Sequence, residues 1–173
     1  VADDNIQEYI RTKLNGTTLK IDTKHNICNS GKITVYLSAK NYEEISASGA
    51  TEIVSDGNLK MQDFSLDLSG SSKVKLDISA ANMKTESSGS SEIILKGQAS
   101  SHDVNMSGSG SVEALDFVVG IYKLNTSGAS KVRINVLNEL DVKSSGSSDV
   151  QYRGNPAQVN NKDSGASSLK KIN

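Results

Sequence analysis

A short motif of tiny residues returns seven times along the 173-residue chain at nearly constant intervals. Each copy begins with Ser-Gly and continues with two more small residues, as in Ser88-Gly89-Ser90-Ser91. The steps between successive motif glycines are 21, 19, 19, 20, 18 and 19 residues. A repeat of that period is typical of a solenoid, in which one coil cannot bury its apolar face alone. The motif glycines are Gly49, Gly70, Gly89, Gly108, Gly128, Gly146 and Gly165.

Apolar residues keep fixed places relative to these glycines. The residue four positions after each glycine is apolar in all seven units, and the residues six after and four before are mostly apolar. This period of two predicts strands whose even offsets point inward and whose odd offsets carry the charge. The glycine and the small residue two after it share the inward offset, so we expect them to stack along the axis. The apolar set four after the glycine is Ile53, Val74, Ile93, Val112, Val132, Val150 and Leu169.

Charges three residues after the glycines support parallel stacking of the coils. Glu52, Lys73 and Glu92 alternate in sign, and Lys131 is expected to face Asp149 in the next coil. Like charges stacked about 4.8 Å apart would repel each other. The opposite side of each coil contains turn-forming residues, so we expect two strands and two turns per coil, with changes of length on that side. These turns are placed at 55–58, 80–82, 97–101, 135–139 and 154–156.

Residues 1–44 lack the motif and predict a small N-terminal β cap with the first strands of the same domain. We favour a hairpin over residues 9–23, turning at Asn15-Gly16, although 2–5 could instead cap a short helical turn at 6–10. A loop over 24–32 and a strand over Ile33–Leu37 follow. Residues 45–173 are then predicted to form a right-handed parallel β-helix, or solenoid, of about seven coils of 18–21 residues.

Bulk composition limits the partners and the compartment. Hydrophobic residues make up 35% and aromatic residues 4% of the chain, which suits a thin solenoid core, and their regular alternation argues against disorder. The formal net charge of −1 without a basic cluster argues against nucleic acid as a partner. Cys28 is the only cysteine, so we expect no internal disulfide. We expect no transmembrane segment, and the abrupt start at Val1 suggests a processed or trimmed N-terminus.

The repeated Ser-Gly unit, preceded by Tyr42-Glu43-Glu44-Ile45, resembles the bacterial family called putative auto-transporter adhesin, head GIN domain. The early segments 3–10 and 19–21 are also similar to that family, whose typical first strand or two are absent here. The resemblance implies a β-solenoid exported to the envelope of Bacteroides-type bacteria, often behind a lipoprotein or other signal peptide. The family has no assigned biochemical activity and no known catalytic residues to carry over.

Residues that could carry chemistry do not form a recognisable site. His25 and His102 are interpreted as solvated loop imidazoles, because neither has a partner at metal-ligand spacing. A Cys28–His25 dyad is the less favoured interpretation of that pair, since closeness in sequence does not make a dyad. The repetition explains the serines better than a hydrolase motif does, and the aspartates share no offset that would suit calcium. Phe117 is expected in the core, and Arg133 is expected to pair with Glu113.

We therefore predict a non-catalytic, adhesin-like binding or scaffold module, exported to the periplasm, outer membrane or cell surface of a Gram-negative bacterium. We expect no catalytic residues, metal or cofactor, and the ligand-binding residues are not assigned. The partner is a glycan or a protein, and a homo-oligomer formed by pairing of the end coil at 163–173 is possible. The alternatives are an enzyme acting on polysaccharide and a structural spacer or sensor with a protein partner. The enzyme would need carboxylates from neighbouring coils converging in one groove.

Overall fold

The computed structural model describes residues 8–24 and 33–173. Contacts between residues divide the chain into two compact units, Val1–Lys40 and Asn41–Asn173, which we describe separately. The described residues of both units form strands and irregular segments without any helix. The predicted all-β class and the parallel solenoid are therefore confirmed.

The N-terminal unit contains one antiparallel hairpin. Strand β1 (Ile10–Asn15) pairs with β2 (Thr18–Thr23), so the hairpin prediction is confirmed for the described part of this unit. Asn15 pairs with Thr18, and the two-residue loop is therefore Gly16-Thr17 rather than the predicted Asn15-Gly16. Gly16 has a φ of 60°, a left-handed conformation that glycine adopts without a Cβ penalty.

The strand predicted over Ile33–Leu37 is wrong. These five residues are irregular, and Val35, Tyr36 and Leu37 are exposed. The strand propensity of isoleucine, valine and tyrosine reflects packing on a pleated surface. No described strand pairs with this segment, so that packing is missing here.

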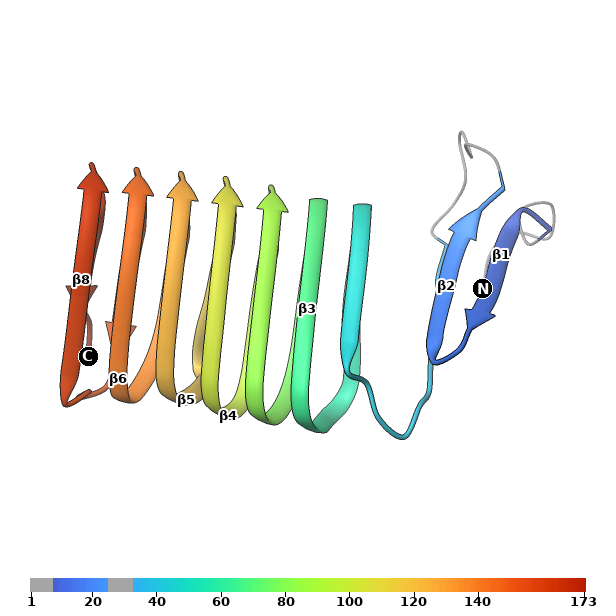
Figure 1. Cartoon of the computed structure of the whole chain (residues 1–173), viewed down its shortest axis with the longest axis horizontal. Helices are drawn as coiled ribbons and strands as arrows, with labels where there is room; N and C mark the ends of the chain where they lie inside the picture. Colours follow the sequence, from blue (N-terminus) through green and yellow to red (C-terminus); the bar gives the residue numbers. More distant parts are fainter. Residues whose placement is uncertain (1–7, 25–32) are drawn as a thin grey trace. The chain divides into compact units, whose positions relative to one another are not determined.

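The second unit is a solenoid whose coils pair in parallel, each with the next (Figure 1). Gly89 pairs with Gly108, Gly108 with Gly128, and Gly128 with Gly146, which confirms that the motif copies stack in register. We name each coil by the motif glycine that ends its strand. The strands are β3 (Glu44–Gly89), β4 (Glu92–Gly108), β5 (Ser111–Gly128), β6 (Lys131–Gly146), β7 (Asp149–Arg153), β8 (Gln158–Gly165) and β9 (Ser168–Lys171).

The solenoid makes about five turns rather than the seven coils expected from the seven motif copies. Seven passages of one corner enclose only six intervals. The last of these intervals is interrupted over 154–157, between β7 and β8. The repeat count therefore overstates the number of complete turns.

Each middle coil is one nearly continuous strand rather than two strands joined by two turns. β4, β5 and β6 run for 17, 18 and 16 residues and break only for two residues after each motif glycine. Of the predicted turns on the far side, only the one at 154–156 interrupts the strand. The other corner keeps its ladder hydrogen bonds, and in two coils it contains a glycine with positive φ, Gly57 at 85° and Gly97 at 105°.

Differences in coil length are absorbed on this far side, as predicted. The register between β4 and β5 shifts between Ile94 and Lys96, and that between β5 and β6 shifts after Ala114 and after Val119. Leu115 lies at this bulge, outside the register pairs of β5 and β6. Its carbonyl oxygen accepts hydrogen bonds from Asn135 Nδ2 at 3.1 Å and Arg153 Nη2 at 2.6 Å. The strand segments before the motif glycines therefore stay in register from coil to coil.

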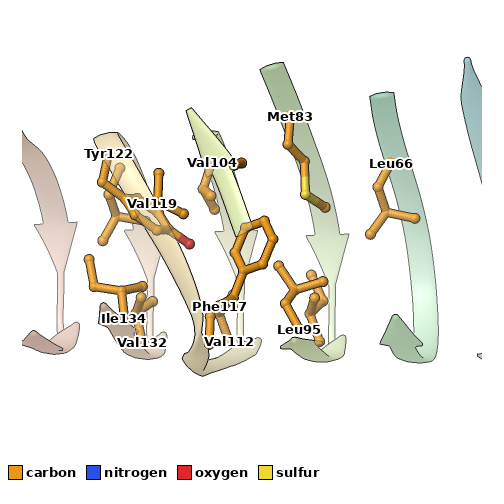
Figure 2. Packing of buried hydrophobic residues seen from close by; sticks show 14 of the residues in the cluster. Leu66, Met83, Leu95, Val104, Val112, Phe117, Val119, Tyr122, Val132 and Ile134 are labelled. Atoms are coloured by element: carbon orange, nitrogen blue, oxygen red, sulfur yellow. The ribbon is translucent and has the colours of Figure 1, made fainter. Parts of the chain in front are cut away.

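The core is a narrow column of side chains from successive coils (Figure 2). Residues four after the glycines are fully buried in the middle coils, and Phe117 is buried in the core as predicted. The positions six before the glycines supply larger side chains. Burial of each Val, Leu, Ile or Phe contributes about 1.5–3 kcal/mol relative to exposure. The larger column consists of Phe64, Met83, His102, Tyr122 and Leu140.

The motif glycines do not point inward, which corrects the expectation drawn from their even offset. All of them are exposed except Gly108, which is half-buried, and their φ values lie between 83° and 113°. The positive φ takes the chain out of the alternation of a strand and turns the corner. The residue two after the glycine is buried as predicted in four of the coils, at Ser72, Ser91, Ser130 and Ser148.

Stacked corners approach one another too closely for any side chain. A Cβ on Gly108 would lie 2.5 Å from the carbonyl oxygen of Gly89. The same carbonyl accepts a hydrogen bond from the N–H of Ser109 at 2.9 Å. Glycine is therefore needed for the conformation of the corner and for the spacing between coils.

Substitution Gly108→Ala tests this requirement. We expect a loss of about 2–3 kcal/mol in the free energy of unfolding, because alanine is strained at this φ and its Cβ meets backbone that cannot move. Urea unfolding followed by circular dichroism measures the loss. The neighbouring exposed Ser107→Ala variant should change stability by less than about 0.5 kcal/mol. Equal stability of the two variants would contradict the close stacking of the corners.

Candidate functional site

The most regular outward surface of the solenoid lies on the strand segments that end at the motif glycines. In the six coils from Gly70 to Gly165, residues one, three and five before the glycine are exposed or half-exposed. In the first five of these coils the residues two, four and six before it are buried. We call the outward set the ladder face. The C-terminal ends of β4, β5, β6 and β8 lie side by side along it (Figure 1).

The column five residues before the glycines alternates in charge. Lys84 is in register with Asp103, Asp103 with Lys123, and Lys123 with Asp141. Opposite charges in neighbouring strands attract, so this order is the one that the fold itself favours. The column reads Ser65, Lys84, Asp103, Lys123, Asp141 and Asn160.

The column three residues before the glycines is segregated instead. It begins with two carboxylates, continues with two amides and ends with two lysines, and Lys143 is in direct register with Lys162. Like charges in adjacent strands repel each other. This column therefore places like charges side by side at both of its ends. It reads Asp67, Glu86, Asn105, Asn125, Lys143 and Lys162.

A shallow groove of about 730 Å³ runs along the segregated column. All six members of the segregated column line it, together with the serines one before the glycines in five coils. Carbon atoms make up most of its exposed lining, which includes Met106, and above them stands a row of hydroxyl, amide and charged groups at the spacing of the coils, about 4.8 Å. The lining serines are Ser88, Ser107, Ser127, Ser145 and Ser164.

Some of these groups are already engaged within the chain. Lys84 Nζ lies 2.7 Å from Glu86 Oε1, and this hydrogen bond raises the pKa of Lys84 above its ordinary value. Asn125 Nδ2 donates to Asn105 Oδ1 at 2.9 Å.

At the C-terminal end of the groove, Asp163 accepts from Ser144 Oγ at 2.5 Å and from Asn161 Nδ2 at 2.6 Å. Neither Lys143 nor Lys162 forms an ion pair with any described residue. Unneutralised positive charge therefore remains at this end of the groove.

The prediction that His102 lies in a solvated turn is wrong. Its side chain is 1% exposed in β4, and its Nε2 lies 2.9 Å from Thr85 Oγ1. The ring meets Phe117 edge-on with centroids 5.7 Å apart and lies 4.9 Å from the ring of Tyr122. Burial lowers the pKa of His102 to about 3, so the imidazole is neutral at ordinary pH. A fully buried imidazole cannot reach an external ligand, so His102 belongs to the core.

The structure also places the other residues that the sequence singled out. Arg133 pairs with Glu113 at 3.1 Å, and Lys73 pairs with Glu92 at 2.7 Å, as predicted. Lys131 lies in register with Asp149 as expected. His25 and Cys28 lie outside the described residues. The described part of the chain contains no group of three or more acidic, histidine or cysteine side chains that could hold a metal ion.

The ladder face was not predicted from the sequence, because charges were compared only at the position three residues after each glycine. The same alignment of the seven units also shows the order of charges at the positions before the glycines, which indicates the ladder face. What the alignment cannot show is that the segregated column lines one groove.

Comparisons with known proteins agree with this architecture. A family profile described as putative auto-transporter adhesin, head GIN domain, matches residues 1–156. No curated protein gives a significant match. No helix in residues 8–24 and 33–173 is long and apolar enough to cross a membrane.

Solved structures share the fold at low sequence identity. A putative adhesin from Bacteroides fragilis has a TM-score of 0.86 and 17% identity, over 98% of this chain and 79% of its own. A putative adhesin from Parabacteroides merdae has a TM-score of 0.73 and 18% identity, over 99% and 81%. A putative lipid binding protein from Parabacteroides distasonis has a TM-score of 0.64 and 20% identity, over 99% and 82%.

The buried imidazole predicts a specific dependence of stability on pH. The folded-state pKa of His102 is lowered to about 3, whereas the unfolded value is near 6.5. The unfolded chain binds the proton first as pH falls. The free energy of unfolding contributed by this group is therefore complete above about pH 6.5 and is lost progressively toward pH 3, by up to about 1.4 kcal/mol per pH unit. Urea unfolding of His102→Gln across this range should give a shallower slope than the parent chain, and an identical slope would contradict burial of a neutral imidazole.

Proposed function

The chain belongs to the putative auto-transporter adhesin, head GIN domain family, and we propose that it is a non-catalytic, adhesin-like binding module. We place it outside the cytoplasm, at the envelope or surface of a Bacteroides-type bacterium. Its contact surface is the ladder face. The carrying observation is the groove lined by one row of polar side chains from six successive coils.

The balance of charge on the ladder face limits its partner. The two charged columns contain the acids Asp67, Glu86, Asp103 and Asp141 and an equal number of lysines. A uniformly charged polymer would be repelled by half of these groups. The partner is therefore a polar macromolecule that is uncharged or carries both signs of charge.

A matched pair of variants tests the ladder face as the contact surface. The face variant combines Asp67→Asn, Glu86→Gln, Lys143→Gln and Lys162→Gln, which removes two charges of each sign. The control variant combines Lys73→Gln, Glu92→Gln, Glu113→Gln and Arg133→Gln, which removes the same charges from the columns after the glycines. We expect the face variant to lose at least tenfold in retention on intact bacteria, mucin-coated beads or a glycan array, while the control keeps the parent value.

Two outcomes of this comparison count against the proposal. Equal retention of the two variants would place the contact elsewhere on the solenoid. Retention of the parent chain on none of these probes would remove the binding function itself. Circular dichroism and urea unfolding of both variants verify that the solenoid remains folded.

The second candidate function is an enzyme acting on polysaccharide, favoured by one observation. Asp67 and Glu86 line the groove at the same offset in neighbouring coils, as a carboxylate pair for glycoside hydrolysis would. A general acid usually needs a desolvated setting, however, and Asp67 is exposed while Glu86 pairs with Lys84.

An assay for catalysis separates the two functions. We expect no release of reducing ends from mucin glycans or plant and bacterial polysaccharides incubated with the full chain. Release that disappears in the Asp67→Asn variant would replace the binding proposal by the enzymatic one.

A further inference from the structure

We propose that the partner of the ladder face is a second copy of this chain, packed face to face with its solenoid axis reversed. The inference rests on the proposed function, because it names the partner of the same surface. It follows from the order of the charges, which complements itself when the row of coils is read backwards.

A twofold axis parallel to the strands, midway between the Gly108 and Gly128 coils, relates the two copies. Such a rotation turns one face onto the other and reverses the order of the six coils. It leaves each column opposite the same column of the second copy. The Gly70 coil then faces the Gly165 coil, the Gly89 coil faces the Gly146 coil, and the two middle coils face each other.

The segregated column matches itself at every position under this rotation. Asp67 meets Lys162 of the second copy, and Glu86 meets Lys143. Asn105 meets Asn125, and two amides can exchange hydrogen bonds. The like charges that repel within one solenoid therefore each find an opposite charge in the dimer.

The alternating column matches itself under the same rotation. Lys84 meets Asp141 of the second copy, and Asp103 meets Lys123. Serines one before the glycines meet serines throughout. Every charge of the two columns faces an opposite charge, and none faces its own sign.

The column seven residues before the glycines adds no repulsion. Asp63 would face Gln158, and Glu139 would face Asn82.

This agreement across columns singles out a second copy among the partners that carry both signs of charge. Another partner would need opposite charges but not this symmetry about the middle of the face, whereas an isologous dimer requires it.

The size of the face predicts a weak dimer. Five steps between coils of about 4.8 Å and six residues of about 3.3 Å along each strand give a patch of roughly 24 by 20 Å. Two such patches bury about 1,000 Å², the lower limit for specific interfaces. Its contacts are exposed ion pairs, which salt screens. The dimer should therefore form at low ionic strength and dissociate at high salt.

Charge reversal at each end of the segregated column provides the test. The basic variant carries Asp67→Lys and Glu86→Lys, and the acidic variant carries Lys143→Glu and Lys162→Glu. Analytical ultracentrifugation of the full chain at low salt should show a dimer for the parent and a dissociation constant raised at least a hundredfold for either variant. An equimolar mixture of the two variants should dimerise again, because all of the reversed charges then face opposite ones. The chain carrying all four substitutions should form a homodimer.

Each result decides the inference. A parent chain that remains monomeric at low salt overturns it, as does a mixture that stays monomeric while circular dichroism shows both variants folded. Variants that remain dimeric alone also overturn it and favour pairing through the end strands β8 and β9. Retention of a monomeric parent on beads or glycans would leave the binding function intact while removing the second copy as its partner. Dimerisation without retention on bacteria, mucin or glycans would keep the second copy as the contact of the ladder face and would remove the adhesin-like function.

Discussion

Close backbone stacking at the motif glycines is the constraint on which the rest of this structure depends. Each corner needs a positive φ, and each lies so close to the preceding corner that a Cβ would meet a carbonyl oxygen. Both demands are met only by glycine. Once the corners stack, the strand segments before them fall into register from coil to coil. The buried column and the outward ladder columns are both consequences of that register.

Much of the architecture could be predicted from the sequence because the repeat and the period of two act together. The buried residues four after the glycines and the Arg133–Glu113 pair follow directly from aligning the units. The far corner could not be predicted, because turn-forming residues there remain hydrogen-bonded to the next coil. His102 was misplaced because Ser-Ser-His-Asp resembles a polar turn, although its even offset from Gly108 already indicated burial. Its position six before Gly108 puts it in the largest column of the core.

The candidate site illustrates a different limit of sequence reasoning. Asp67, Asn105 and Lys143 look like scattered polar residues until the register of the strands gathers them in one groove. Their order along the groove is unfavourable for an isolated solenoid, since the adjacent column shows that alternation is available to the fold. The like charges that lie side by side in this column are best explained by a binding partner that contacts them. The order of charges on this surface supports the binding proposal more strongly than the family name does.

The confinement of register shifts to the far side of the coils has a consequence for how such proteins change. Residues gained or lost at the far-side shifts, such as the one between Ala114 and Val118, alter a bulge and leave the strand segments before the glycines aligned. Loops and insertions can therefore diversify one side freely. Adding or deleting a whole coil is different, because it changes how many rungs the polar rows contain and moves their midpoint. Natural variation in length within single coils should thus be common, whereas variation in coil number would redefine what the molecule recognises.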